Sequence, residues 1–96
     1  MTITEFQKLI EDIYYEKDSE RGMAGTFMWF VEEVGELSRA LRRGSREELH
    51  DEFADVAAWL ATLASIAGVN LEEAVTSKYQ GGCPKCGATP CRCSDG

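Results

Sequence analysis

The sequence predicts an all-α fold, an antiparallel helical bundle completed by oligomerisation, followed by a short cysteine-rich tail. Apolar residues recur at helical spacing, and no segment alternates apolar and polar residues as a strand does. Residues 56–69, VAAWLATLASIAGV, carry no charge on any side of a helix, which indicates burial all round. The other helices of a 96-residue chain can hardly cover this segment, so we expect a second subunit to do so. The alternative is a central helix in a monomeric bundle.

The first predicted helix begins at a capping box, TEFQ, with Thr4 as N-cap and Gln7 reaching back to it. It runs to about Lys17. Residues 18–25, DSERGMAG, are polar and contain two glycines, so we expect a loop there. The apolar stripe of this helix consists of Phe6, Leu9, Ile10 and Ile13.

A second helix is predicted from about Thr26 to Arg43, and Gly44 ends it. Its apolar residues follow helical spacing and define a core face. They are Phe27, Phe30, Val31, Val34, Leu37 and Leu41.

A third helix is predicted from the capping box SREE, residues 45–48, to Ala67, before Gly68. Asn70 then caps a short fourth helix that runs through about Lys78. The remaining residues contain too much Gly, Pro and Cys for a helix. We therefore divide the chain into a helical domain, residues 1–80, and a tail, residues 81–96.

The net charge is −7, from 10 basic and 17 acidic residues, which argues against a nucleic-acid partner. A small polyanion can still bind where metal cations bridge it to the acids. The N-terminus lacks the apolar run of a signal peptide, and no segment has the length of a membrane span. We expect a cytoplasmic protein without membrane contact.

Two pairs of acids stand beside the apolar stripes: Glu33 and Glu36 on the second helix, Glu52 and Asp55 on the third. Because a two-residue turn joins these helices, they must pack antiparallel, and counting from the turn places the pairs at similar heights. Four carboxylates without His or Cys suit Mg²⁺ better than zinc or iron. A single such pair is usually a solvated face, but two matched pairs favour a metal site.

EEVGEL followed by DEFADVAAWLATLA resembles the paired motifs of the MazG-like, all-α nucleotide pyrophosphohydrolases. The resemblance covers about residues 27–79 and implies that Glu33, Glu36, Glu52 and Asp55 are catalytic Mg²⁺ ligands. It implies dimers or tetramers that convert nucleoside triphosphates to the monophosphate and pyrophosphate. The resemblance further implies that a metal-activated water attacks the α-phosphorus, with one carboxylate as general base.

Other side chains are weaker candidates for nucleotide contacts. Trp29 shares a side of its helix with the acids and can stack on a nucleobase, whereas packing is the favoured role of Trp59. Lys78 is a candidate phosphate contact, as is Arg42 or Arg43, although each is as readily explained as a solvated surface cation.

The tail contains four cysteines, Cys83, Cys86, Cys91 and Cys93, in the spacing C-x₂-C-x₄-C-x-C. Four thiolates within eleven residues favour a structural Zn²⁺ knuckle, because four ligands leave no open position. Iron–sulfur binding, redox thiols and a disordered tail are the alternatives. The whole chain is then either a Mg²⁺-dependent nucleotide pyrophosphohydrolase or a non-catalytic helical assembly module with a structural zinc knuckle.

Overall fold

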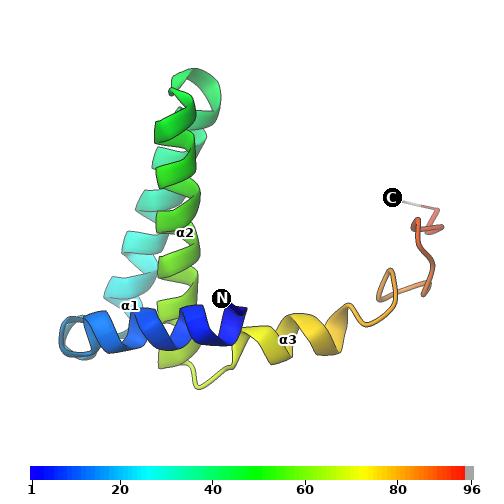
Figure 1. The fold of residues 1–96 in the computed structure, drawn as a ribbon, viewed down its shortest axis with the longest axis horizontal. Helices are drawn as coiled ribbons and strands as arrows, with labels where there is room; N and C mark the ends of the chain where they lie inside the picture. The colour runs from blue at the N-terminus through cyan, green and yellow to red at the C-terminus, as the bar shows by residue number, and fades with distance from the viewer. Residues whose placement is uncertain (95–96) are drawn as a thin grey trace.

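In a computed structural model, which describes residues 1–94, the chain forms three helices: α1 (Ile3–Arg43), α2 (Arg46–Ile66) and α3 (Leu71–Lys78). The second half of α1 stands beside α2, the first half of α1 lies across the foot of this pair, and α3 leads away from it (Figure 1). No strand occurs in this part of the chain. The prediction of an all-α fold is therefore confirmed.

The chain changes direction at Gly22, where φ is 76° and ψ is 178°. Glycine adopts this positive φ without the steric cost that a side chain brings. The hydroxyl of Thr26 donates a 2.7 Å hydrogen bond to the carbonyl of Gly22, and Arg21 pairs with Asp18 at 2.8 Å. The predicted loop over residues 18–25 is thus wrong, since local bonds confine the break to one residue and helix continues on both sides.

The N-cap of α1 is Thr2, not Thr4. The Thr2 hydroxyl accepts from the backbone N–H of Glu5 at 3.0 Å, and the Glu5 carboxylate accepts from the Thr2 N–H at 2.7 Å. The sequence contains two overlapping capping boxes, TITE and TEFQ, and local pattern alone does not choose between them.

Gln7 does not cap the helix but makes hydrogen bonds to residues far along the chain. It is 9% exposed, and its amide nitrogen donates to the Val69 carbonyl at 2.8 Å and to the Ser65 hydroxyl at 3.1 Å. Its amide oxygen accepts from the Leu71 N–H at 2.8 Å. These three bonds fasten the first half of α1 to the corner between α2 and α3.

The N-caps of α2 and α3 are the residues predicted from the sequence, Ser45 and Asn70. Ser45 and Glu48 exchange the two capping-box bonds at 3.2 Å each, and the side chain of Asn70 accepts from the Glu73 N–H at 2.9 Å. α2 ends at Ile66, just before Gly68, whose φ is 73°. The predicted third and fourth helices are confirmed to within a residue at each end.

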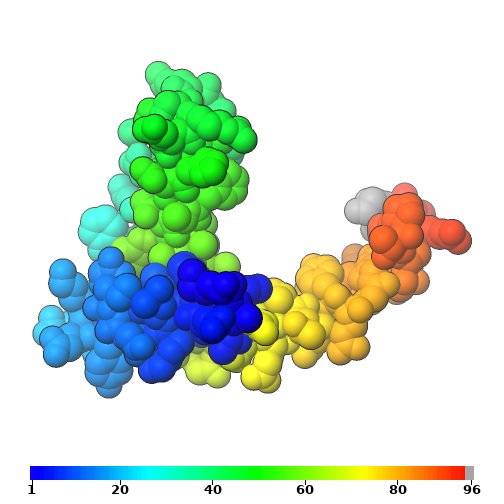
Figure 2. Space-filling model, viewed as in Figure 1, coloured from blue at the N-terminus to red at the C-terminus, as the bar shows by residue number. Residues whose placement is uncertain are grey.

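The single chain is an open structure with little core. Its radius of gyration is 15.8 Å, whereas a compact domain of this length has about 12.5 Å. Figure 2 shows two arms meeting at an angle, with the tail at the far end of one of them. Buried apolar side chains among residues 1–94 are Ile10, Ala40, Ala61 and Ala64.

Residues 56–69 were predicted to be buried between subunits, and this is wrong for the middle of the segment. Ala61 is 0% exposed within the single chain, and Thr62 and Ala64 are buried as well. The first half of α1 crosses the foot of α2 (Figure 1), where Gln7 bonds to Ser65, and sequence spacing alone does not indicate this crossing. Leu60 and Ile66 remain 41% and 37% exposed, so only part of the segment is left for a partner.

No single helix within the described range is long and apolar enough to cross a membrane. α2 and α3 reach that length and composition only when taken together across a 95° bend.

Candidate active site

Three of the four predicted acids meet between α1 and α2. Glu33 comes from the second half of α1, and Glu52 and Asp55 come from α2. One carboxylate oxygen of each lies within 4.8 Å of one carboxylate oxygen of the others. We call these three residues the carboxylate cluster. The antiparallel turn at Gly44–Ser45 brings them to one height, as the counting argument predicted.

Glu36 lies outside this cluster. Its carboxylate is 3.4 Å from Arg39, one turn further along α1. It still acts on the cluster at longer range, because its charge contributes to the raised pKa of both Glu33 and Glu52. The four predicted acids therefore form a group of three with a fourth carboxylate beside it.

Glu33 and Glu52 have a raised pKa, so these two carboxylates hold their protons more tightly than isolated ones. Partial burial is the main cause that raises the pKa of Glu33, and the charges of Asp55 and Glu36 add to it. Desolvation also raises the pKa of Glu52, followed by the charge of Glu33. These like charges repel one another, so the arrangement favours a bound cation.

An aromatic cavity of about 400 Å³ adjoins the cluster on the side of the Gly22 break. Glu33 and Asp55 form part of its wall. Trp29 and Trp59 line it together, with ring centroids 6.1 Å apart and planes 13° apart. The guanidinium of Arg21 lies 4.7 Å from the Trp59 ring centre. Such a wall suits a flat aromatic ligand.

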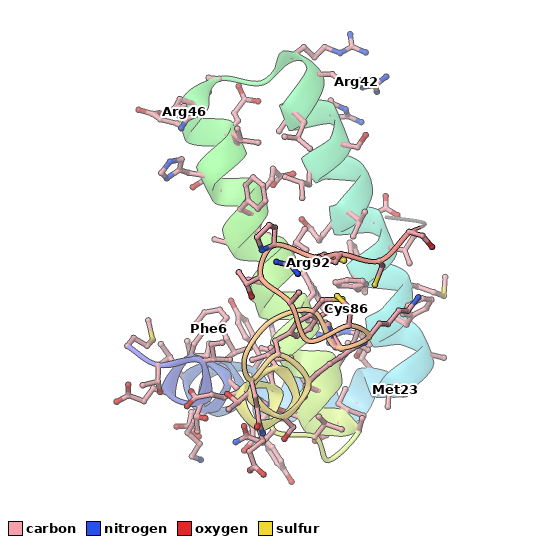
Figure 3. All side chains as sticks on the ribbon, turned by 90° about the vertical axis from the view of Figure 1, so that its right-hand side faces the viewer. Phe6, Met23, Arg42, Arg46, Cys86 and Arg92 are labelled. Carbon is pink, nitrogen blue, oxygen red and sulfur yellow. The ribbon has the colours of Figure 1, made fainter. Side chains whose placement is uncertain are left out.

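A polar groove of about 410 Å³ adjoins the cluster on the side of the Gly44 turn. Glu36 and Glu52 line it, together with Arg39 and Arg43. Arg42, by contrast, projects away from the helix pair (Figure 3). Of the two arginines that the sequence offered at this turn, Arg43 is therefore the one that faces the groove.

Cavity, cluster and groove follow one another along α1. From Trp29 to Arg39 is ten residues, or about 15 Å of helix. This distance is comparable with the length of an extended nucleoside triphosphate. The arrangement can hold an aromatic ring at one end and anionic groups at the other.

The donor set of the cluster fits a hard divalent cation. Its three carboxylates supply oxygen ligands and no sulfur or nitrogen, which matches the preference of Mg²⁺. Two of the three side chains are half-buried and Asp55 is exposed, so room is left for water and a phosphate oxygen. We find no mismatch between these residues and Mg²⁺.

Lys78 lies elsewhere in the chain. It ends α3, with its ammonium 5.7 Å from the centre of the Tyr79 ring, and it lines a separate hollow with Cys83 and Cys93. Within one chain it contributes to neither the aromatic cavity nor the polar groove. The four cysteines gather at this far end, and each is a free thiol.

Sequence reasoning missed Arg21 and Arg39. Arg39 carries a readable signal, since it follows Glu36 by three residues and so shares its side of the helix. Arg21 was assigned to a loop. Only the one-residue break at Gly22 places it over Trp59.

The comparison with protein families agrees with this geometry. The model of the MazG nucleotide pyrophosphohydrolase domain matches residues 22–87, about two thirds of the chain. The match begins where α1 changes direction and includes the cluster, the groove and the first two cysteines. No curated protein matches the chain. The resemblance seen in the paired acidic motifs is thus confirmed, and the chain belongs to the MazG nucleotide pyrophosphohydrolase domain family.

Proposed function

We propose that this protein is a Mg²⁺-dependent nucleoside triphosphate pyrophosphohydrolase, which releases the nucleoside monophosphate and pyrophosphate. The observation that carries the proposal is the position of the carboxylate cluster between an aromatic cavity and a groove with two arginines. Family membership supports the general activity.

The aromatic cavity receives the base. Trp29 is 52% exposed, so it can offer ring surface to a nucleobase. Trp59 is half-buried and held by Trp29 and Arg21, so it supports the wall. Trp29 is therefore the residue we assign to base binding.

The polar groove receives the outer phosphates. Arg39 and Arg43 present guanidinium groups suited to phosphate oxygens. Arg39 is 3.4 Å from Glu36, and this exposed pair can open at little cost. The groove also contains acids, which repel an unaccompanied triphosphate.

Glu33, Glu52 and Asp55 hold Mg²⁺ in this proposal, with Glu36 as a further candidate ligand. When bound, Mg²⁺ neutralises phosphate charge and lowers the pKa of water. The oxygen of a water molecule bonds to the α-phosphorus, and the bond from that phosphorus to the bridging oxygen of the β-phosphate breaks. A carboxylate accepts the proton of the water, and pyrophosphate leaves.

Product analysis tests this function directly. Purified protein is incubated with a panel of nucleoside triphosphates with and without Mg²⁺, and pyrophosphate and orthophosphate are measured separately. We expect Mg²⁺-dependent pyrophosphate with at least one nucleotide. Orthophosphate as the product, or no hydrolysis across the panel, refutes the proposal and favours the non-catalytic assembly module.

We also propose that the active form is a homo-oligomer. Phe27, Val31, Val34 and Leu41 form one stripe of α1 and are 54%, 52%, 41% and 60% exposed. Glu36, nine residues after Phe27, points about 180° away. A second copy can therefore cover this stripe without covering the carboxylates, and it supplies the apolar burial that one chain lacks.

Light scattering tests the assembly. The wild type is expected to be a dimer or tetramer at micromolar concentration, and Val31→Asp is expected to reduce its mass because a buried unpaired charge is costly. Thr76→Asp, on the exposed surface of α3, is the matched control and leaves the mass unchanged. A monomeric wild type contradicts this proposal.

A further inference from the structure

The tail gathers four thiols at one point. The Sγ atoms of Cys83, Cys86, Cys91 and Cys93 lie within 4.8 Å of one another, and those of Cys83 and Cys93 are 3.7 Å apart. A tetrahedral metal with thiolate bonds of about 2.3 Å separates its sulfurs by about 3.8 Å. A disulfide needs about 2.05 Å. The separation of Cys83 and Cys93 is therefore that of two ligands on one metal.

The backbone around these thiols is shaped to hold them. Cys83 donates its N–H to the Ala88 carbonyl at 3.0 Å, and the Cys83 carbonyl accepts from the Gly87 N–H at 2.7 Å. These two bonds close a tight turn over residues 83–88, which contains the first two cysteines. Gly87 has φ 73°, which favours glycine. A side chain at Gly82 would meet the Gly87 carbonyl oxygen at 2.9 Å. Glycine is thus required where two stretches of backbone come close.

Two sulfurs also accept backbone hydrogen bonds. The N–H of Arg92 points to Cys86 Sγ, and the N–H of Cys93 points to Cys91 Sγ, each at 3.3 Å. Figure 3 shows Cys86 and Arg92 on adjacent parts of the tail. Such N–H donors stabilise metal-bound thiolates and orient them.

Within the part of the tail that the structure describes, no apolar core accounts for this order. From residue 79 to 94 no side chain is fully buried, so the segment has no apolar core of its own. Residues 74–94 contain no His, Asp or Glu that could complete a different site. Their three cations, Lys78, Lys85 and Arg92, offset the charge that four thiolates leave on a divalent metal. A metal ion held by four thiolates supplies the binding energy that an apolar core does not supply here.

We propose that Cys83, Cys86, Cys91 and Cys93 bind one Zn²⁺ per chain in a closed tetrahedral site. Four protein ligands leave no position for water, so this zinc is structural and distinct from the carboxylate cluster. It orders residues 82–94. The site stands whether or not the chain hydrolyses nucleotides.

Metal analysis of the full-length chain, purified under reducing conditions without added metal, is the test. We expect one zinc per chain, and near zero in the double variant Cys83→Ser/Cys86→Ser. Thr89→Ala, beside the cysteines but not among them, is the control and keeps its zinc. The helical circular dichroism of the double variant should match the wild type, because α1, α2 and α3 make no use of the thiols.

Thiol reactivity of the wild type gives a second measurement that needs no variant. The four thiols should react slowly with a thiol reagent and rapidly after a strong zinc chelator is added. Four freely reactive thiols without bound metal overturn the proposal. Stoichiometric iron, or a Cys83–Cys93 disulfide found by mass spectrometry in the purified chain, overturns it as well.

Discussion

Replacing Asp55 by asparagine removes one charge from the carboxylate cluster. Oxygens of Asp55 and Glu33 lie within 4.8 Å of each other, and unit charges at that distance repel by about 3.5 kcal/mol at an effective dielectric of 20 and about 0.9 kcal/mol in water. Asp55 is exposed, so the lower figure applies. We expect Asp55→Asn to stabilise the metal-free chain by about 1 kcal/mol, which corresponds to a Tm increase of about 4–8 °C.

With Mg²⁺ bound, the wild type should be more stable than Asp55→Asn. A ligand at one hundred times its Kd stabilises the protein that binds it by about 2.7 kcal/mol, which exceeds the repulsion removed by the substitution. Thermal unfolding is followed by circular dichroism at one protein concentration and low salt, with and without Mg²⁺, and pyrophosphate release is measured in parallel. The wild type should gain the larger Tm increase from Mg²⁺, and Asp55→Asn should lose hydrolysis.

Glu47→Gln is the control on the same helix. Glu47 is exposed in the first turn of α2, where a negative charge interacts favourably with the helix dipole. Its loss should therefore lower stability by about 0.3–1 kcal/mol, the opposite sign, without changing the response to Mg²⁺. If Asp55→Asn keeps full activity and the wild-type Mg²⁺ response, the cluster is not the metal site. If it lowers the metal-free Tm, the repulsion argument fails.

Three further results are expected. Gly22→Ala should destabilise the chain by about 1–2 kcal/mol in denaturant unfolding, because φ 76° strains an alanine. Gly35→Ala is the control: it lies at a helical position with open space and should stabilise the chain by up to about 1 kcal/mol. Equal effects of the two substitutions would contradict the strain argument. Trp29→Ala should raise KM for the nucleotide more than it lowers kcat, and an unchanged KM would exclude Trp29 from the base site. Because the pKa of Glu33 is raised, the metal-free native state holds this proton more tightly than the unfolded chain does. The free energy of unfolding should therefore fall as pH rises from about 4.5 through the native pKa. Glu33→Gln should flatten this part of a urea-unfolding pH profile, and an unchanged profile would contradict the raised pKa.

Local signals in the sequence were sufficient for the helix caps of α2 and α3. Ser45 and Asn70 bond to the backbone three residues ahead, so neighbours in sequence decide the outcome. The same local logic failed for Thr4, because Thr2 offered an equally good capping box. It also failed around Gly22, where the Thr26 hydrogen bond to the Gly22 carbonyl and the Arg21–Asp18 pair shortened an expected loop to a single residue.

The carboxylate cluster was predicted from the sequence only in part. The spacing of Glu33, Glu52 and Asp55 from the short turn predicted that they meet, because the rise per residue of a helix fixes their heights. The exclusion of Glu36 did not follow, because it depends on how far each helix is rotated about its axis and on the pairing with Arg39. Side-chain packing between α1 and α2 sets that rotation.

By itself, the sequence determined the helical fold class, the pairing of two acidic motifs across a turn and the grouping of four cysteines, because each depends on residues close together in the chain. The tertiary structure alone decided that Gln7 bonds to Ser65, Val69 and Leu71, that Ala61 is buried within its own chain and that Arg21 lies over Trp59. These contacts join residues 38 to 64 positions apart or depend on the direction the chain takes after Gly22. Helical periodicity says which side chains share a face of one helix, but only packing determines what that face meets.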